Sequence, residues 1–153
     1  MTKRALAPLF VLLLLAAPSL AQDASTDEAA AMQAWMAYMT PGEPHQKLAA
    51  GSGNWSHTLQ MWQAPGAEPM ETTATSVRRM DLGGRYLTEE FTGTIMGMPF
   101  EGRAVMGYDN ARKKYFSTWI DNMGTGLMVA WGEPVEGSNQ IEFHGTYVDP
   151  MTG

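Results

Sequence analysis

The chain contains no cysteine among its 153 residues. It therefore has no disulfide, no thiolate metal ligand and no cysteine nucleophile. Three common catalytic patterns are missing as well, namely the Gly-x-Ser-x-Gly elbow, the His-Glu-x-x-His helix and a phosphate-binding glycine loop. Stability must therefore come from the burial of apolar side chains. No such motif is present to indicate a particular reaction.

Positive charge is scarce, because ten Lys and Arg stand against 16 Asp and Glu. The two short basic clusters are Arg78-Arg79 and Arg112-Lys113-Lys114, and the second coincides with a predicted turn, which favours a solvated turn over a phosphate site. Nucleic acids and anionic membranes recruit clustered Lys and Arg. The composition therefore predicts neither of these partners.

Long apolar runs are limited to the N-terminus. Lys3-Arg4 precede an apolar segment from Leu6 to Ala17, and Ser19-Leu20-Ala21 then gives the small-residue pattern of a signal peptidase site. The apolar segment is shorter than the about 20 residues that a membrane-spanning helix needs. We predict that residues 1–21 are a cleaved export signal. The mature protein is then periplasmic or secreted, with 132 residues, a net charge of −8 and the size of one domain.

A helix is predicted after the signal, within a connecting region over residues 22–44. Ser25 with Glu28 three residues later is a capping box, and a helix over 27–39 follows. One helical face collects Met32, Trp35, Met36 and Met39. This stripe is interpreted as a docking face, with a lid over a cavity mouth or a Met-rich metal tract as alternatives. A second short helix is predicted over 44–50.

From Trp55 onward the hydrophobic period changes to two, and turn signals recur at short intervals. Strands are predicted over 54–63, 70–80, 84–93, 99–108, 114–121, 126–132 and 140–148. This rhythm is typical of an antiparallel sandwich or barrel. No repeat or linker divides the region, so residues 45–153 are assigned to one mainly β domain.

Six segments together identify a family resemblance. They are Gly53-Asn54-Trp55, Leu82-Gly83-Gly84-Arg85, Gly97-Met98-Pro99-Phe100-Glu101-Gly102, Gly107-Tyr108-Asp109, Trp119-Ile120-Asp121 and Asp149-Pro150-Met151-Thr152-Gly153. In this combination the chain resembles the bacterial domain-of-unknown-function family 1579 from about residue 45 to its end. The resemblance implies a calycin-like antiparallel β-barrel, similar in outline to lipocalins, and no established activity. The family pattern continues past the final turn, so one or more closing strands are expected to be missing from this copy.

The Gly-x-Trp opening of the first strand also resembles the start of a lipocalin barrel, where the Trp seals the closed base. Glycine permits a sharp entry into the strand, and a large ring fills the base. Trp55 is therefore assigned a structural role at the barrel base rather than a ligand contact.

A candidate binding face lies on the strand over 114–121. Alternation places Tyr115, Ser117, Trp119 and Asp121 on one side, an apolar face with a few polar groups, as in small-molecule sites. Tyr108, Arg85 and Arg103 are added as candidate sources of hydrogen bonds or charge. The alternative is that Trp119 is core, that Asp121 caps the following turn and that Arg103 is solvated.

A metal site is a weaker alternative. If His57, His144 and Asp121 all pointed inward, two imidazoles and a carboxylate would suffice for a metal ion, although a histidine satisfied within the barrel explains each one equally. Glu89 and Glu90 are adjacent on a strand and point to opposite faces, so they form no catalytic carboxylate pair. No cofactor is predicted.

These observations predict an exported, non-catalytic barrel that binds a small apolar or amphipathic molecule. The first alternative is a protein–protein interaction module that uses the helix stripe or an open sheet edge. The second is a metal-binding protein or metal-dependent enzyme built on the two strand histidines.

Overall fold

The computed structural model describes residues 20–148, which form parts of two compact units, Met1–Trp35 and Met36–Gly153. Most of the predicted export signal and the closing Asp149–Gly153 turn lie outside the described residues. Among the residues described, no helix has the length and apolar character needed to cross a membrane.

Two helices precede the sheet, α1 (Leu20–Met39) and α2 (Glu43–Ala49). The predicted start of α1 is wrong, because the helix already begins at Leu20 and passes through Ser25. The segment is rich in alanine and has no proline or glycine before Pro41, so nothing in it interrupts a helix. The short second helix agrees with its prediction and carries Pro44 in its first turn.

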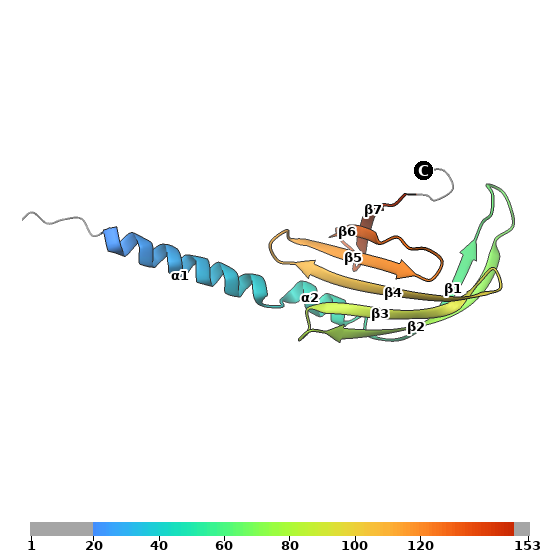
Figure 1. Cartoon of the computed structure of the whole chain (residues 1–153), viewed down its shortest axis with the longest axis horizontal. Helices are drawn as coiled ribbons and strands as arrows, with labels where there is room; N and C mark the ends of the chain where they lie inside the picture. Colours follow the sequence, from blue (N-terminus) through green and yellow to red (C-terminus); the bar gives the residue numbers. More distant parts are fainter. Residues whose placement is uncertain (1–19, 149–153) are drawn as a thin grey trace, which may run out of the picture. The chain divides into compact units, whose positions relative to one another are not determined.

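Seven strands follow, each close to its predicted range. They are β1 (Gly53–Met61), β2 (Met70–Asp81), β3 (Tyr86–Ile95), β4 (Met98–Asp109), β5 (Lys114–Asp121), β6 (Met128–Pro134) and β7 (Ile141–Thr146). All neighbours pair antiparallel in chain order, and β1 and β7 are the two edges of the described sheet, which curls into a half-barrel (Figure 1). The prediction of a mainly β, antiparallel fold is confirmed, with a half-barrel in place of a closed barrel.

The strand register defines which side chains share the concave face. One row across the sheet runs from Trp55 to Ser76, Phe91, Gly102 and Asp121, each paired with the next. Successive residues of a strand point to opposite faces, so the buried positions at every second residue of β2, β3 and β4 belong to the same face as this row. The concave face therefore carries the core of the domain.

Two apolar clusters occupy this face. At one end, which we call the closed end, Leu48 of α2 packs with Leu87 and Tyr115, and Met106 and Tyr108 lie against them. Farther along the strands, a second cluster is formed by Ala74, Phe91 and Phe100, with Leu59, Ile95 and Trp119 around it. The helix α2 thus caps one end of the half-barrel with buried apolar bulk.

Trp55 lies at the α2 end of β1, but its side chain is not the buried plug of that end. The residue is 43% exposed, whereas Leu48 is 5% exposed. Its indole N–H donates to the Gly51 carbonyl at 3.0 Å, and its ring lies under the Arg78 guanidinium at 5.2 Å. The sequence predicted that the Trp55 ring fills the base of the barrel. In the structure Leu48 of α2 is the buried apolar side chain at this end.

Candidate binding site on the concave face

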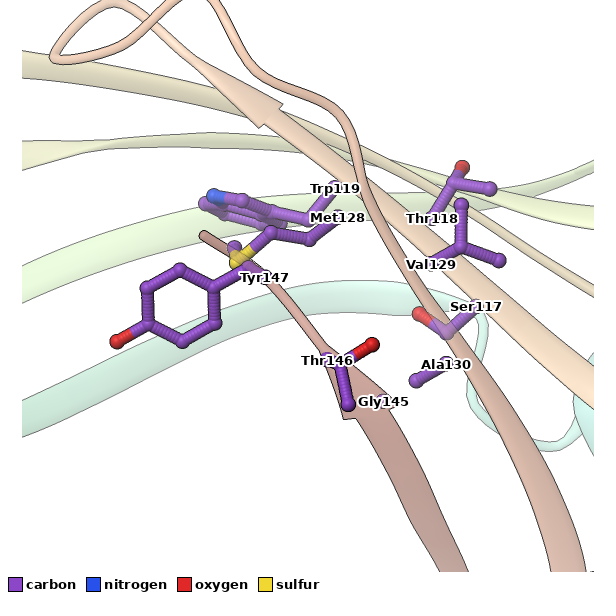
Figure 2. Close-up of a pocket in the computed structure, with 9 residues that line it drawn as sticks. All are labelled: Ser117, Thr118, Trp119, Met128, Val129, Ala130, Gly145, Thr146 and Tyr147. Atoms are coloured by element: carbon purple, nitrogen blue, oxygen red, sulfur yellow. The ribbon is translucent and has the colours of Figure 1, made fainter. Parts of the chain in front are cut away.

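A hollow of about 260 Å³ opens beside β5, β6 and β7, and we call it the β5–β7 hollow. It is lined by Ser117, Thr118, Trp119, Met128, Val129, Ala130, Gly145, Thr146 and Tyr147. Figure 2 shows Trp119, Met128 and Tyr147 gathered at one end, with Ser117, Ala130 and Thr146 farther along. The lining is mainly apolar with a few hydroxyl groups, which is the usual composition of a small-molecule site.

Trp119 is held in one orientation from several sides. Its indole N–H donates to Asp121 Oδ2 at 2.8 Å, and the other oxygen of Asp121 accepts from the Met123 backbone N–H at 2.9 Å. The ring stacks on Phe100 with centroids 6.2 Å apart and meets Phe91 edge-on at 5.7 Å. A fixed aromatic wall loses little conformational entropy when a ligand binds against it.

Gly102 allows this position of the indole. A Cβ at Gly102 would lie 2.2 Å from Trp119 Cζ2, a distance that no side chain can adopt. The indole therefore lies directly over the backbone of β4, and the absence of a side chain at Gly102 is a requirement of the site.

A group of polar side chains crosses the same concave face, and we call it the polar belt: His57, Ser76, Arg78 and Glu89. Glu89 is 5% exposed and Ser76 is 2% exposed. His57 Nε2 lies 2.8 Å from Ser76 Oγ, and Arg78 Nε lies 2.9 Å from Glu89 Oε1. A buried carboxylate needs such a partner, because an isolated charge is strongly disfavoured in an apolar interior.

The polar belt is continuous with the aromatic wall of the hollow. The His57 ring lies against Phe91 with centroids 5.0 Å apart, and Phe91 in turn contacts Trp119. Two successive ring contacts therefore connect the polar belt to the β5–β7 hollow. The concave face therefore carries a polar region and an apolar region that are joined through Phe91.

The belt does not have the geometry of a nucleophilic relay. In such a relay one imidazole nitrogen faces the hydroxyl and the other faces the carboxylate. Here the same atom, Nε2 of His57, faces both Ser76 Oγ at 2.8 Å and Glu89 Oε1 at 3.9 Å. The three groups are therefore arranged for hydrogen bonding and charge pairing, not for passing a proton through the ring.

The sequence-predicted binding residues are separated by the structure. Ser117 and Trp119 line the β5–β7 hollow, and Asp121 orients the indole. Tyr115 is 3% exposed and belongs to the closed-end core, where Tyr108 contacts it with ring centroids 4.9 Å apart.

The two predicted arginines lie elsewhere. Arg85 donates to the carbonyls of Leu82 and Met39 at 3.1 and 2.7 Å, so its guanidinium fixes the chain before α2. Arg103 is exposed and pairs across the sheet with Glu90 and Ile120, on the convex face. Neither side chain faces the β5–β7 hollow.

The predicted metal ligands are not brought together. His57 belongs to the concave face, while His144 pairs with Trp131, which in turn pairs with Phe116 on the convex face. The His144 side chain is 78% exposed and lies 3.5 Å from Glu142. Within residues 20–148 no group of three His, Asp or Glu side chains is arranged to hold a metal ion.

Sequence reasoning missed three of the four members of the polar belt. Ser76, Arg78 and Glu89 sit at every-second positions that otherwise carry Ala74, Leu87, Phe91 and other core residues. The available signal was a polar or charged residue at a strand position where alternation predicts a buried apolar side chain. Arg78 was instead grouped with Arg79, although adjacent strand residues point to opposite faces.

At the closed end the pKa of one buried histidine is lowered. His45 of α2 is 5% exposed, and its Nδ1 accepts the Gly42 backbone N–H at 3.0 Å. Burial is the main cause that lowers the pKa of His45 below its ordinary value of 6.5, and the Arg85 charge adds to it, while a hydrogen bond with the Tyr108 backbone acts in the opposite direction. The neutral imidazole is therefore the form that the fold requires.

A family model with the description protein of unknown function (DUF1579) matches residues 40–153. No curated protein and no solved structure matches the chain.

Proposed function

Because the chain belongs to the DUF1579 family, whose description names no activity, we propose a function from the geometry of its concave face: the half-barrel binds a small amphipathic molecule without catalysis. The observation that carries the proposal is the β5–β7 hollow with its fixed indole. A volume of about 260 Å³ is just below the range of drug-sized pockets, which favours a small ligand.

The contacts divide such a ligand into two parts. The apolar part packs against Trp119 and Met128, where apolar area removed from water is worth about 25 cal/mol per Å². Ser117 and the polar belt lie on the same face and offer hydrogen bonds to a polar part. A molecule with both parts uses the whole face.

A neutral apolar dye tests the proposal. We expect N-phenyl-1-naphthylamine to bind the purified protein with a rise in dye fluorescence, and Met128→Lys to weaken this binding about tenfold or more, because a charge in the hollow opposes an apolar ligand. Met70→Lys is the matched control, since Met70 is 37% exposed and Met128 is 39% exposed, and Met70 lines a different hollow. Equal binding by the two variants would contradict the proposal.

We also propose that the protein acts after export. The support is the basic start, apolar segment and small-residue site of residues 1–21. Expression in a Gram-negative host should yield a periplasmic protein whose intact mass lacks these 21 residues. Leu13→Arg interrupts the apolar segment and should leave an uncleaved cytoplasmic protein. Periplasmic material of full mass would count against cleavage.

A second candidate function is protein binding at the open edges of the sheet. Within the described residues β1 and β7 each have one neighbour, and an edge strand presents backbone N–H and C=O groups that can pair with another chain. Sedimentation velocity over a hundredfold range of concentration tests self-pairing. A constant monomer mass, together with dye binding, would favour the small-molecule function.

A further inference from the structure

The polar belt has a feature that packing alone does not require. A buried ion pair stabilises a protein no more than well-packed apolar residues of the same volume. Stability alone therefore does not explain an ion pair on the core face. Arg78 and Glu89 face the interior of the half-barrel from neighbouring strands, opposite each other in the register. Ala104, the next residue in this row, is small and buried.

The Arg78 guanidinium is held in place but keeps donors available. Its Nε is 2.9 Å from Glu89 Oε1, yet its N–H is not directed at that oxygen, and Nε has no hydrogen-bond partner in the part of the chain that the structure describes. The Trp55 ring lies under the guanidinium at 5.2 Å. The Arg78 side chain retains 26% of its exposure, so the guanidinium is not completely enclosed.

We infer that the polar belt binds the head group of the ligand, and that this head group is a carboxylate received by Arg78. The inference rests on the proposed function, because it names the polar part of the molecule whose apolar part lies in the β5–β7 hollow. A guanidinium presents pairs of parallel N–H donors that match the two oxygens of a carboxylate. Glu89 and Trp55 fix the plane of the guanidinium, which reduces the entropy lost on binding.

His57 supports the same chemistry. Its Nε2 is engaged with Ser76 Oγ, and its ring lies between the belt and Phe91. A ligand chain that follows Phe91 to Trp119 would therefore leave the head group at the belt and the tail at the hollow. The Arg78 guanidinium carries donors and no acceptor, which favours an acceptor-rich head group such as a carboxylate over an amine at this residue.

The test compares three ligands with the same ten-carbon chain: decanoic acid, 1-decanol and methyl decanoate, each displacing N-phenyl-1-naphthylamine. We expect decanoic acid at pH 8 to bind about tenfold more tightly than the other two, the ratio that one charge-assisted hydrogen bond supplies. Equal binding of the three would overturn the carboxylate inference while leaving the proposed function intact. No displacement by any of them, with no dye binding, would overturn both.

Variants separate recognition from folding. Arg78→Gln alone leaves Glu89 buried without its partner, so the double variant Arg78→Gln/Glu89→Gln is used, in which both charges are removed together. We expect the ratio of decanoic acid affinity to 1-decanol affinity to fall from about ten to about one in this variant. The matched control is Arg79→Gln/Glu90→Gln, which makes the same changes at the neighbouring exposed positions. A preference that survives in the first variant, or disappears in the control, would contradict the role of Arg78.

Discussion

The closed end and the β5–β7 hollow share one sheet and one face, yet they differ in what lies against them. At the closed end α2 adds Leu48 to the sheet, and Leu87 and Tyr115 become 3% exposed. At the hollow no residue of α2 is part of the lining, and Met128 stays 39% exposed. The comparison indicates that the end covered by α2 supplies stability, and that the part of the same face without α2 keeps apolar side chains exposed.

The largest expected effect comes from opening the closed end. Leu48→Ala removes buried methyl groups between α2 and the sheet and should lower the free energy of unfolding by about 2–5 kcal/mol. Urea denaturation measures the change. Leu82→Ala is the control, because Leu82 is 65% exposed and should change stability little. Similar losses in both variants would contradict the division between the two regions.

The next effect is expected at the hollow. Gly102→Ala places a Cβ against the Trp119 ring, so the indole must move, at a cost of about 1–3 kcal/mol in stability. We also expect weaker dye binding and a shifted tryptophan emission. Gly126→Ala is the control, since a Cβ there meets no atom within 4 Å. Unchanged binding in Gly102→Ala would show that the orientation of the indole is irrelevant to the site.

A smaller effect should follow removal of the group that orients the indole. Asp121→Ala deletes the acceptor of the Trp119 N–H and of the Met123 N–H, and we expect a loss of about 1 kcal/mol in stability with a few-fold loss in dye affinity. Isothermal dye titration and urea denaturation measure the two quantities. Glu68→Ala, in an exposed loop, serves as the control. A change in stability without any change in affinity would assign Asp121 to the turn alone.

The smallest effect is a pH dependence confined to the closed end. The pKa of His45 is lowered in the folded protein, so the unfolded chain binds a proton more readily around pH 6.5. Stability from this group is present above that pH and is lost as the pH falls below it towards the folded pKa. His45→Gln should reduce the loss of stability between pH 7.5 and pH 5.5, whereas His144→Gln, at an exposed position, should not. Equal pH dependence in the parent protein and His45→Gln would contradict this origin.

The strands and turns were predictable because their signals are local. The two-residue period from Trp55 onward and the turn residues fixed seven strands close to their observed bounds. Ser117 and Trp119 were predicted to share one face because their strand alternates visibly, and in the structure both line the same hollow. The predicted start of α1 was wrong. The helix begins at Leu20, so the capping pattern at Ser25 lies inside it and does not mark its first turn.

Other roles depended on partners distant in the chain. Asn110 was expected only as a turn residue, yet its side-chain amide donates to the carbonyls of Ala37, Tyr38 and Thr40 at 3.2, 3.0 and 2.9 Å. Its side chain therefore links the turn after β4 to the backbone at the C-terminal end of α1 and just beyond it. Arg85 acts in the same way on Met39, which explains why a predicted ligand residue is structural.

The amino-acid sequence alone was enough to predict the strand positions, the mainly β antiparallel fold class and the family, because alternation, turn residues and characteristic segments are local features of the chain. Which polar residues face the interior became clear from the folded sheet. His57, Ser76, Arg78 and Glu89 come from three strands, and they meet because the register of β1, β2 and β3 aligns them on the concave face. Register is set by the packing of the whole sheet, so no single segment of sequence contains that information.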